Sequence, residues 1–329
     1  MIDVVALGEL LIVFSCLERD SLGYPTLAAH PGGAPANFLA AVAAMGGSTA
    51  LMATVGEDAF GRQLIKTLSD LGIGTACIRR DPDVFTTLAF VTLDEAGDRE
   101  FSFARKPGAD TRLTFGHGER KLLSEARALH FGSLSLTHEP ARTATARALA
   151  FARSHGLLIS YDPNLRTPLW DDLSRAKEQL LWGMKQADVV KLSREEGEFL
   201  FDRPVEACAE ILRRDYGLKL VFVTCGSDGC YFDNGTARGW EPALTDLRVA
   251  DTTGAGDIFG GTALWGLLQT DQAPQDLQEP ALRQIVRRAN VAAGLSTTRP
   301  GGLSSVPDKE AIRAAMDAQQ DRNGEIPRL

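Results

Sequence analysis

The sequence has few cysteines and histidines, and their spacing argues against several classes of protein. Its 329 residues include five cysteines, an odd number, and none of them forms a CxxC motif. We therefore expect reduced thiols in a cytoplasmic protein rather than a disulfide scaffold or a redox pair. The five histidines are scattered, with no two at metal-ligand spacing, which argues against a transition-metal centre held by side chains.

Long apolar runs and blocks of basic residues are also missing. The apolar stretch at residues 4–14 contains Glu9 and is shorter than the roughly 20 residues that cross a bilayer. The first residues lack the basic segment and the cleavage pattern of a signal peptide. The net charge is −8, with Lys and Arg spread along the chain, so neither a nucleic acid nor a membrane is expected as a partner.

What is present is the composition of an ordinary globular protein, with 44% apolar and 24% charged residues. The length suits one large α/β domain or two smaller ones. No internal repeat and no low-complexity linker divides the chain. We therefore predict one contiguous domain over residues 1–329.

Strand and helix patterns alternate along much of the chain. Buried-strand patterns occupy residues 4–7, 50–55, 129–131, 157–161, 189–191 and 220–224, with a short hairpin at 231–240. Helical patterns occupy residues 38–45, 60–71, 141–154, 173–186, 204–215, 254–268, 280–296 and 309–318. This alternation predicts an α/β fold built from parallel βαβ units. Residues 85–106 instead alternate polar and apolar side chains around a turn at 94–98, which predicts a small β flap.

The most informative motif is the run DTTGAGD at residues 251–257, which precedes a helical pattern. Glycines at a helix N-terminus leave unpaired N–H groups and positive dipole charge available to an anion. A carboxylate at the same place repels a simple anion. It is appropriate where a phosphate is transferred and Asp257 takes a proton from the attacking hydroxyl. We expect the helix dipole to lower the pKa of Asp257.

This run also permits two other interpretations. Gly254, Gly256 and Gly260 make a weak dinucleotide-binding pattern, but a Rossmann site expects that turn after the first strand of its βαβ unit. The glycines could also serve only a tight structural turn. An NAD-dependent dehydrogenase and a purely structural turn therefore remain alternatives.

Two signatures, more than 200 residues apart and in the right order, identify a family resemblance. Residues 251–257 resemble the C-terminal signature of the PfkB, or ribokinase-like, carbohydrate kinases. The run GGAPAN at 32–37, followed by Gly46 and Gly47, resembles the N-terminal one. The resemblance implies a three-layer α/β/α fold with a central, mostly parallel sheet. It also implies a small β-sheet lid, with strands from about residues 10–30 and 85–106.

The resemblance further implies an ATP-dependent sugar kinase, with Mg²⁺ as cofactor and a monovalent cation such as K⁺ as a second. In such a kinase Asp257 is the catalytic base. The backbone N–H groups of Gly254, Ala255 and Gly256 form the anion hole. A homodimer through the lid is also implied.

The acceptor end of the site is expected near the first strand and the N-terminal signature. Gly32 and Gly33 allow close approach of the backbone to a sugar, and Asn37 offers a donor and an acceptor; a plain glycine turn with Asn as a helix N-cap is the alternative. Glu9 follows the first strand, where ligands of open α/β sheets bind. Fructokinases carry an Asp in a GELLIDF-like segment here, but this chain has Val13, which cannot hydrogen-bond a hydroxyl.

Two further segments resemble fructokinases, and the one around Arg105 also resembles 2-keto-3-deoxygluconate kinases. Arg105 is similar to a lid arginine that reaches over the acceptor; a solvated arginine at a strand end is the alternative. The run DPNLR at 162–166 resembles a fructokinase segment and implies substrate binding by Asp162, Asn164 and Arg166. Asp162 is expected to contact hydroxyls or solvated Mg²⁺, and Arg166 a phosphate or an acidic substrate group. The alternative for this run is a capped loop with an internal Asp–Arg pair.

The nucleotide end is predicted from three more resemblances. Residues 191–196 match the family's NxxE motif with Ser193 in place of Asn, and Glu196 is expected to organise Mg²⁺ through water. The same residues also read as a capping box at a helix start. Thr224, Gly226 and Gly229 resemble a nucleotide loop. Asn290 and Ala293 fall on a helix expected to border the adenine, unless Asn290 serves packing alone.

The favoured acceptor is fructose, phosphorylated on a hydroxymethyl group, because residues 162–166 and Arg105 resemble fructokinases. The departure at Val13 leaves 2-keto-3-deoxygluconate, another modified sugar or a nucleoside as alternatives. A sugar- or nucleotide-binding regulator without catalysis is the alternative from another class. The presence of Asp257 behind intact glycines favours the enzyme.

Overall fold

The computed structural model describes residues 1–93, 99–270 and 272–324. Within these residues the main feature is a nine-stranded sheet in the order β13-β12-β11-β10-β9-β8-β1-β4-β5. All its neighbouring strands are parallel except the two pairs that involve β12. The strands are β1 (Ile2–Leu7), β4 (Thr49–Gly56), β5 (Ile78–Asp81), β8 (Ala126–Gly132), β9 (Leu158–Asp162), β10 (Val189–Ser193), β11 (Leu220–Thr224), β12 (Cys230–Asp233) and β13 (Arg238–Glu241).

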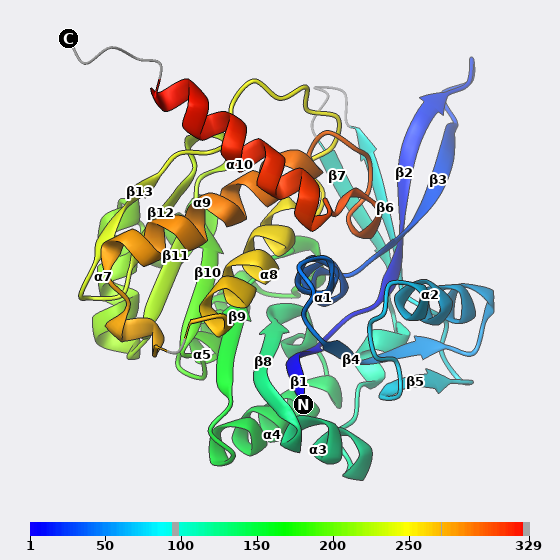
Figure 1. Cartoon of the computed structure of the whole chain (residues 1–329). Coiled ribbons are helices and arrows are strands. Elements are labelled where there is room, and N and C mark those ends of the chain that lie inside the picture. Colours follow the sequence, from blue (N-terminus) through cyan, green and yellow to red (C-terminus); the bar gives the residue numbers. More distant parts are fainter. Residues whose placement is uncertain (94–98, 271, 325–329) are drawn as a thin grey trace.

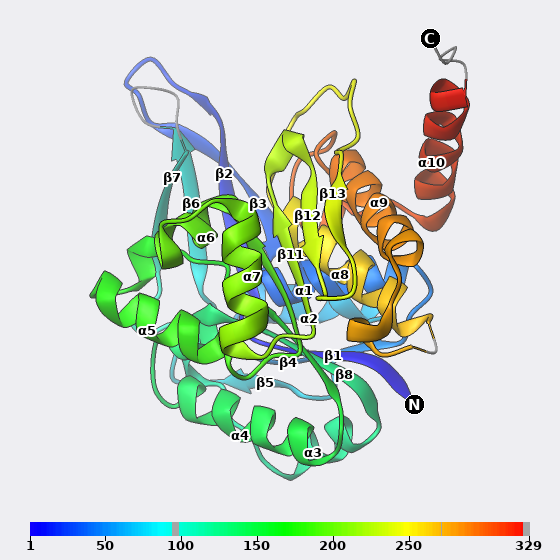
Figure 2. The same ribbon diagram turned by 90° about the vertical axis from the view of Figure 1, so that its left-hand side faces the viewer.

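Helices cover both faces of this sheet and make the fold three-layered (Figures 1 and 2). The helices on one face are α3 (His117–Ser124), α4 (Ala141–Ser154), α5 (Leu173–Met184), α6 (Arg194–Phe201) and α7 (Val205–Tyr216). Those on the other face are α1 (Ala34–Ala44), α2 (Ala59–Asp70), α8 (Ala255–Leu268) and α9 (Glu279–Ser296), with α10 (Lys309–Gly324) packed outside α9. Short 3₁₀ turns occur at Ala109–Arg112, Ser133–Leu136, Thr167–Leu169, Gly226–Asp228, Pro274–Asp276 and Leu303–Ser305.

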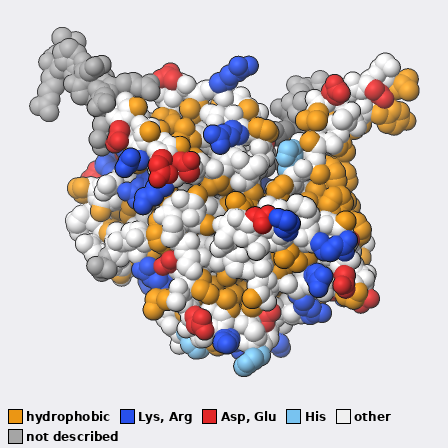
Figure 3. All heavy atoms as spheres, turned by 45° about the vertical axis from the view of Figure 1, so that its right-hand side comes forward, with side chains coloured by type: hydrophobic (Ala, Val, Ile, Leu, Met, Phe, Trp, Pro, Cys, Tyr) orange, Lys and Arg blue, Asp and Glu red, His pale blue; other side chains and the backbone are white. Residues whose placement is uncertain are grey.

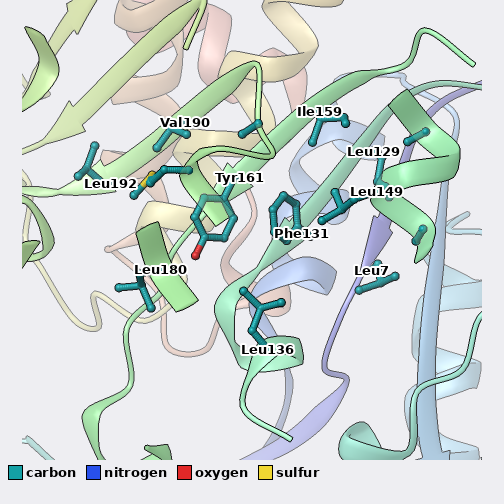
Figure 4. Close-up of a cluster of buried hydrophobic side chains, with 14 of the residues drawn as sticks. Leu7, Leu129, Phe131, Leu136, Leu149, Ile159, Tyr161, Leu180, Val190 and Leu192 are labelled. Atoms are coloured by element: carbon teal, nitrogen blue, oxygen red, sulfur yellow. The ribbon is translucent and has the colours of Figure 1, made fainter. Parts of the chain in front are cut away.

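The strands between the two edges of the sheet contribute side chains to two hydrophobic cores, one under each helical layer. Along β1, Val5 and Leu7 enter the first core while Val4 and Ala6 enter the second, as the two-residue period of a strand requires. Figure 4 shows part of the first core, where the rings of Phe131 and Tyr161 stack with centroids 4.4 Å apart. Burial on both faces explains the continuous apolar runs of these strands.

A second sheet of four strands, in the order β3-β2-β6-β7, stands beside the first and projects beyond it (Figures 1 and 2). Its strands are β2 (Leu11–Arg19), β3 (Pro25–Gly32), β6 (Leu88–Leu93) and β7 (Arg99–Ala104). One face packs on α2, where Phe14 of β2 meets Phe60 edge to face at 5.9 Å. The predicted turn at 94–98 lies outside the described residues, but the flanking strands pair as predicted.

The predicted α/β fold with a mostly parallel sheet and a small second sheet is confirmed. Helix α4 has the predicted limits, while α1 begins four residues earlier than predicted because Pro35 is compatible with a first helical turn. Helix α10 runs beyond the predicted residue 318. Among the helices of the described segments, none combines the length and apolar character needed to span a bilayer. All five cysteines are free thiols.

Candidate active site

The candidate site lies along the carboxyl edge of the main sheet, where its parallel strands end side by side. Asp162 at the end of β9 pairs in register with Gly132 of β8. Ser193 at the end of β10 pairs with Thr224 at the end of β11. This edge is where open α/β sheets bind ligands, so the topology brings together residues that are distant in sequence.

Asp257 is a buried, hydrogen-bonded carboxylate at this edge. It lies in the first turn of α8 and is only 6% exposed. Its Oδ2 accepts a hydrogen bond from Nδ2 of Asn37 at 2.9 Å, and its Oδ1 accepts one from Nδ2 of Asn164 at 3.0 Å. The two amides come from α1 and from the loop after β9, so three segments fix the orientation of one carboxylate.

The pKa of Asp257 is raised above its ordinary value of 3.8, not lowered as the helix dipole predicted. Burial is the largest cause, and the nearby negative charge of Asp162 adds to it. The bonds from Asn37 and Asn164 and the charge of Lys191 act in the opposite direction but do not prevail. The prediction was wrong because a helix N-terminus is a weak influence beside loss of water. A carboxylate with a raised pKa is the better base.

The glycine-rich approach to α8 has the conformation that the motif predicts. Gly254 is the N-cap in the left-handed region, with φ 79°, which a side chain would strain. A Cβ there would also lie 3.0 Å from Cα of Gly302. The N–H of Ala255 donates to the carbonyl of Thr252 at a long 3.3 Å. Gly254 and Asp257 face the cavity, while Gly256 faces Lys191.

The N-terminal signature meets the first strand in an equally tight junction. Gly33 caps α1 with φ 119°, and a Cβ on it would lie 2.3 Å from the carbonyl oxygen of Glu9. A Cβ on Gly32 would lie 2.7 Å from Cγ2 of Val13. Oε1 of Glu9 accepts from the N–H of Ala34 at 2.8 Å. Gly33 is therefore required for close packing of backbone at this junction, and Gly32 leaves room for the side chain of Val13.

A cavity of about 300 Å³ connects the two signatures. Its polar wall is made of Glu9, Asn37, Asn164, Arg166 and Asp257, and its far wall of loop residues around 251–254 and 300–302. The second sheet supplies a mainly apolar wall through side chains that alternate along its strands, namely Leu11, Val13, Ser15, Leu17, Ala89, Val91 and Phe103. The volume is that of a small-molecule site.

Glu9 has the most clearly displaced titration in this cavity. Burial raises its pKa from the ordinary 4.5 to about 7, with the charges of Asp110 and Asp257 contributing. Between pH 4.5 and about 7, Glu9 is protonated in the folded protein but ionised in the unfolded chain. The contribution of Glu9 to the free energy of unfolding is therefore complete below pH 4.5 and is lost as the pH rises through 7.

Between pH 5 and pH 8 we expect the parent to lose about 2–3 kcal/mol of unfolding free energy that Glu9→Gln retains. The variant retains it because the amide does not ionise. Urea unfolding of both proteins at the two pH values measures this. Parallel pH dependence of parent and variant would show that Glu9 titrates normally.

Arg105 is not placed over the cavity as the resemblance implies. Its side chain is 3% exposed and pairs with Asp110 at 2.6 Å. It also donates to Oγ1 of Thr137 at 3.0 Å and to the carbonyl of Leu134 at 3.1 Å. The alternative of a solvated arginine is wrong, since the guanidinium of Arg105, directly after β7, is buried. Leu134 lines the cavity, so Arg105 reaches the site through that neighbour.

Of the polar residues in the segment after β9, only some reach the cavity. Asn164 and Arg166 line the cavity, whereas Asp162 is 1% exposed and lies beneath it. The alternative of an internal Asp–Arg pair is wrong: Nη2 of Arg166 donates to Oδ1 of Asn164 at 3.1 Å, and Asp162 pairs with Lys191. Asn164 adopts φ 46°, a left-handed conformation that Asn tolerates.

Ser193 and Glu196 form the predicted capping box at the start of α6. Oγ of Ser193 accepts from the N–H of Glu196 at 3.2 Å, and Oε2 of Glu196 accepts from the N–H of Ser193 at 2.8 Å. The other carboxylate oxygen, Oε1, accepts from the N–H of Leu165 at 2.7 Å. Glu196 therefore ties α6 to the loop that carries Asn164.

The remaining predicted nucleotide residues lie away from the 300 Å³ cavity. Thr224 ends β11, and Gly226 and Gly229 shape the turn that follows it, where the N–H of Gly229 donates to the carbonyl of Gly226 at 3.2 Å. Asn290 on α9 is buried and donates to the carbonyls of Glu241 and Pro242 at 2.9 and 3.0 Å. Ala293 is half-buried one turn later.

Two residues at the site were missed in the sequence. Asp251 accepts from the N–H and Oγ1 of Thr253, and its Oδ2 accepts from the N–H of Gly301 at 2.9 Å. It thereby holds the loop at 300–302 against the glycine turn. Lys191 contributes a buried ammonium group from β10. Its place at the start of the 191–196 motif is its signal in the sequence, because a lysine in a strand is common by itself.

Comparison with known proteins agrees with this geometry. Residues 1–309 match the profile described as pfkB family carbohydrate kinase. Fructokinase-1 of Oryza sativa subsp. japonica is 39% identical over 319 residues, which cover 96% of this chain and 98% of that protein.

Solved structures agree as well. A fructokinase with bound ATP from Xylella fastidiosa superposes with a TM-score of 0.89 at 29% identity, covering 97% and 99% of the two chains. A fructokinase from Vibrio cholerae O395, bound to fructose, ADP and calcium ion, gives 0.81 at 30% identity, with 95% and 98% covered. With both signatures meeting at Asp257, the chain belongs to the pfkB family of carbohydrate kinases.

Proposed function

We propose that this carbohydrate kinase transfers the γ-phosphate of ATP to a hydroxymethyl group of fructose. The observation that carries the proposal is the Asp257 carboxylate, held by two amides at the end of a sugar-sized cavity. The similarity to the rice fructokinase over nearly the whole chain supports this acceptor, and so does the likeness to the fructose-bound structure from Vibrio cholerae.

In this proposal the acceptor occupies the cavity, with its attacking hydroxyl next to Asp257. Glu9, Asn37, Asn164 and Arg166 offer hydrogen bonds to the other hydroxyls, and Gly32 and Gly33 let the backbone approach. Asp257 accepts the proton as the phosphoryl group is transferred. The N–H groups around Gly254–Gly256 receive the negative charge of that group. In this position Arg105 and Asp162 act through neighbouring residues rather than by touching the sugar.

The nucleotide is proposed to bind on the other side of the glycine turn, along the ends of β10 and β11. Ser193, Thr224, Gly226 and Gly229 line that course, and Asn290 and Ala293 mark its outer end on α9. The likeness to the ATP-bound structure from Xylella fastidiosa supports this placement. A monovalent cation such as K⁺ is proposed near the loop at 297–302, which Asp251 holds.

Glu196 fits a magnesium ion carried by the phosphates. Its carboxylate is buried beside the ammonium group of Lys191. Oxygen donors are the ligands that Mg²⁺ prefers, and it usually keeps several waters. Both carboxylate oxygens of Glu196 already accept backbone N–H groups, which favours a contact through water. When bound, the ion would shield the charge of the phosphates.

The proposed reaction is tested by measuring ADP release with a panel of sugars and sugar acids. We expect fructose to give the highest kcat/KM, because it combines a free hydroxymethyl group with hydroxyls that match the polar wall. Release that is fastest with a 2-keto-3-deoxy sugar acid would reassign the acceptor. Sugar binding by calorimetry without ADP release from any member of the panel would instead indicate a binding regulator.

A modified-sugar acceptor is the second candidate, and Val13 is the observation that favours it. Val13 lies on the cavity wall beside Leu11, Ala89 and Val91, so this wall offers few partners to a hydroxyl. The neighbouring polar pair is Nε2 of His30 with Oγ of Ser15, at 3.1 Å. An acceptor that lacks one hydroxyl on this side would therefore lose few hydrogen bonds to the protein.

We further propose that both sheets belong to one kinase domain over residues 1–329, with the four-stranded sheet as lid and as dimer interface. Leu17, Leu22 and Tyr24 on the β2–β3 hairpin are 67%, 81% and 71% exposed, and Figure 3 shows apolar side chains gathered over the projecting sheet. Exposed apolar groups of this kind mark interfaces. The free thiols support a cytoplasmic location.

We expect light scattering to give a mass twice the 35.4 kDa of one chain. The double variant Leu22→Glu/Tyr24→Glu should give the mass of one chain, because charged side chains cannot be buried in an apolar interface without a partner. A parent protein that scatters as a single chain would contradict the dimer.

A further inference from the structure

Lys191 is a buried ion-pair partner that has no part in the reaction described above. It lies on β10, and its Nζ is 3.0 Å from Oδ2 of Asp162, with the two side chains 10% and 2% exposed. Removing two charges from water costs several kcal/mol per ion, and a packed apolar pair is often as stable. A pair kept at such a place is explained better by what it positions than by the stability it adds.

The contacts of Asp162 lead directly to the catalytic base. Its second oxygen, Oδ1, accepts from the N–H of Asn164 at 3.2 Å, which closes a turn of the kind that Asp side chains stabilise. That turn holds Asn164 at φ 46° and directs its Nδ2 to Oδ1 of Asp257, 3.0 Å away. Lys191, Asp162, Asn164 and Asp257 thus form one continuous chain of contacts from β10 to α8.

The ammonium group also lies against the glycine turn itself. A Cβ on Gly256 would be 2.8 Å from Nζ of Lys191, so the lysine head contacts the backbone just before Asp257. The titratable groups around it come from five elements. Asp162 on β9, Glu196 on α6 and Asp257 on α8 are carboxylates. His130 on β8, whose pKa is lowered to about 3, and the thiol of Cys230 on β12, whose pKa is raised by burial, are neutral. Lys191 is therefore the local cation among three carboxylates.

We infer that Lys191 and Asp162 form a buried positioning pair that holds Asn164 against Asp257 and balances the charge beside this base. The inference rests on the proposed role of Asp257. Its two members act on Asp257 in opposite directions: the negative charge of Asp162 raises the pKa of Asp257, and the positive charge of Lys191 lowers it. Removing the charge of Lys191 should therefore raise the pKa of Asp257, and removing the charge of Asp162 should lower it.

The test compares Lys191→Met, Asp162→Asn and the double variant with the parent. We expect Lys191→Met to lower kcat about 10- to 100-fold, since a catalytic group displaced by about 1 Å loses that much, with the KM for ATP changed less than threefold. The acidic limb of its pH–kcat profile should move to higher pH. The limb of Asp162→Asn should move to lower pH.

The double variant keeps the size of both side chains without either charge. It should fold as stably as the parent and recover kcat above that of Lys191→Met, with its acidic limb back near that of the parent. Lys219→Met is the control, because Lys219 pairs with Asp188 at 2.9 Å where β10 and β11 begin, at the opposite edge of the sheet. Its kcat and pH profile should be unchanged.

The pKa of Asp257, followed by carboxyl ¹³C NMR in the parent and in each variant, gives the same comparison without turnover. A pKa of Asp257 that moves in opposite directions in the two single variants supports the inference. If at the same time no sugar is phosphorylated, only the proposed function fails. Displacements in the same direction, or a kcat of Lys191→Met within threefold of the parent, would overturn it. So would a rise confined to the KM for ATP, which would make Lys191 a nucleotide ligand.

Discussion

Asp257→Asn should lower kcat by about 10²–10⁴-fold and leave ATP binding nearly unchanged. The variant loses the proton acceptor. It also places an NH₂ group opposite one of the two amides that now donate to the carboxylate, those of Asn37 and Asn164. The surroundings of α8 are otherwise preserved, since the side chains have the same size. Initial rates of ADP release and calorimetric titration with ATP separate the two effects.

Two controls make this result specific. Glu279→Gln, which changes an exposed carboxylate paired with Arg283 on α9, should retain the parent kcat. Asp257→Ala should lose as much activity as Asp257→Asn, because both lack the base. Turnover by Asp257→Asn within tenfold of the parent would rule out a base role for this residue.

Gly261→Ala should both destabilise the protein and slow the reaction, although residue 261 does not touch the cavity. A Cβ there would lie 2.2 Å from the carbonyl oxygen of Phe38, so α8 and α1 could not pack as closely as they do. Overpacking of this kind costs about 1–3 kcal/mol. The same displacement separates Asn37 on α1 from Asp257 on α8, and a shift of about 1 Å can cost about 100-fold in kcat.

Urea unfolding and initial rates measure the two effects, and Gly118→Ala is the matched control. Gly118 also lies in a helix, α3, but the nearest atom to a Cβ there is Sγ of Cys77 at 4.0 Å. This control should be unchanged in kcat and as stable as the parent or up to about 1 kcal/mol more stable. Equal behaviour of the two alanine variants would show that the α1–α8 approach is not limiting.

Much of the fold could be predicted because its signals are local. The alternation of buried strands and amphipathic helices is set by side-chain periodicity, and α4, α8 and β11 appear where that periodicity places them. Short or edge elements such as β5 and α3 were not predicted, since four to eight residues carry too little pattern.

The site divides in the same way. Asp257, Asn37 and Glu9 follow from motifs whose chemistry is visible in the chain, and the structure brings all three to one cavity. The contacts of Arg105 and Asp162 could not be predicted from the sequence. The partner of a buried charged side chain depends on which oppositely charged group the fold places beside it. Here those partners are Asp110 and Lys191.

The sequence by itself determined the family, the reaction class and the two glycine-rich junctions, since these depend on residue types at short spacing. Only the tertiary structure decided the direction of the pKa of Asp257, because that direction depends on burial and on Asp162, which is 95 positions away in the chain. It also decided which charges pair. Both are effects of the low dielectric at the carboxyl edge of the sheet, where distant segments exclude water from one another.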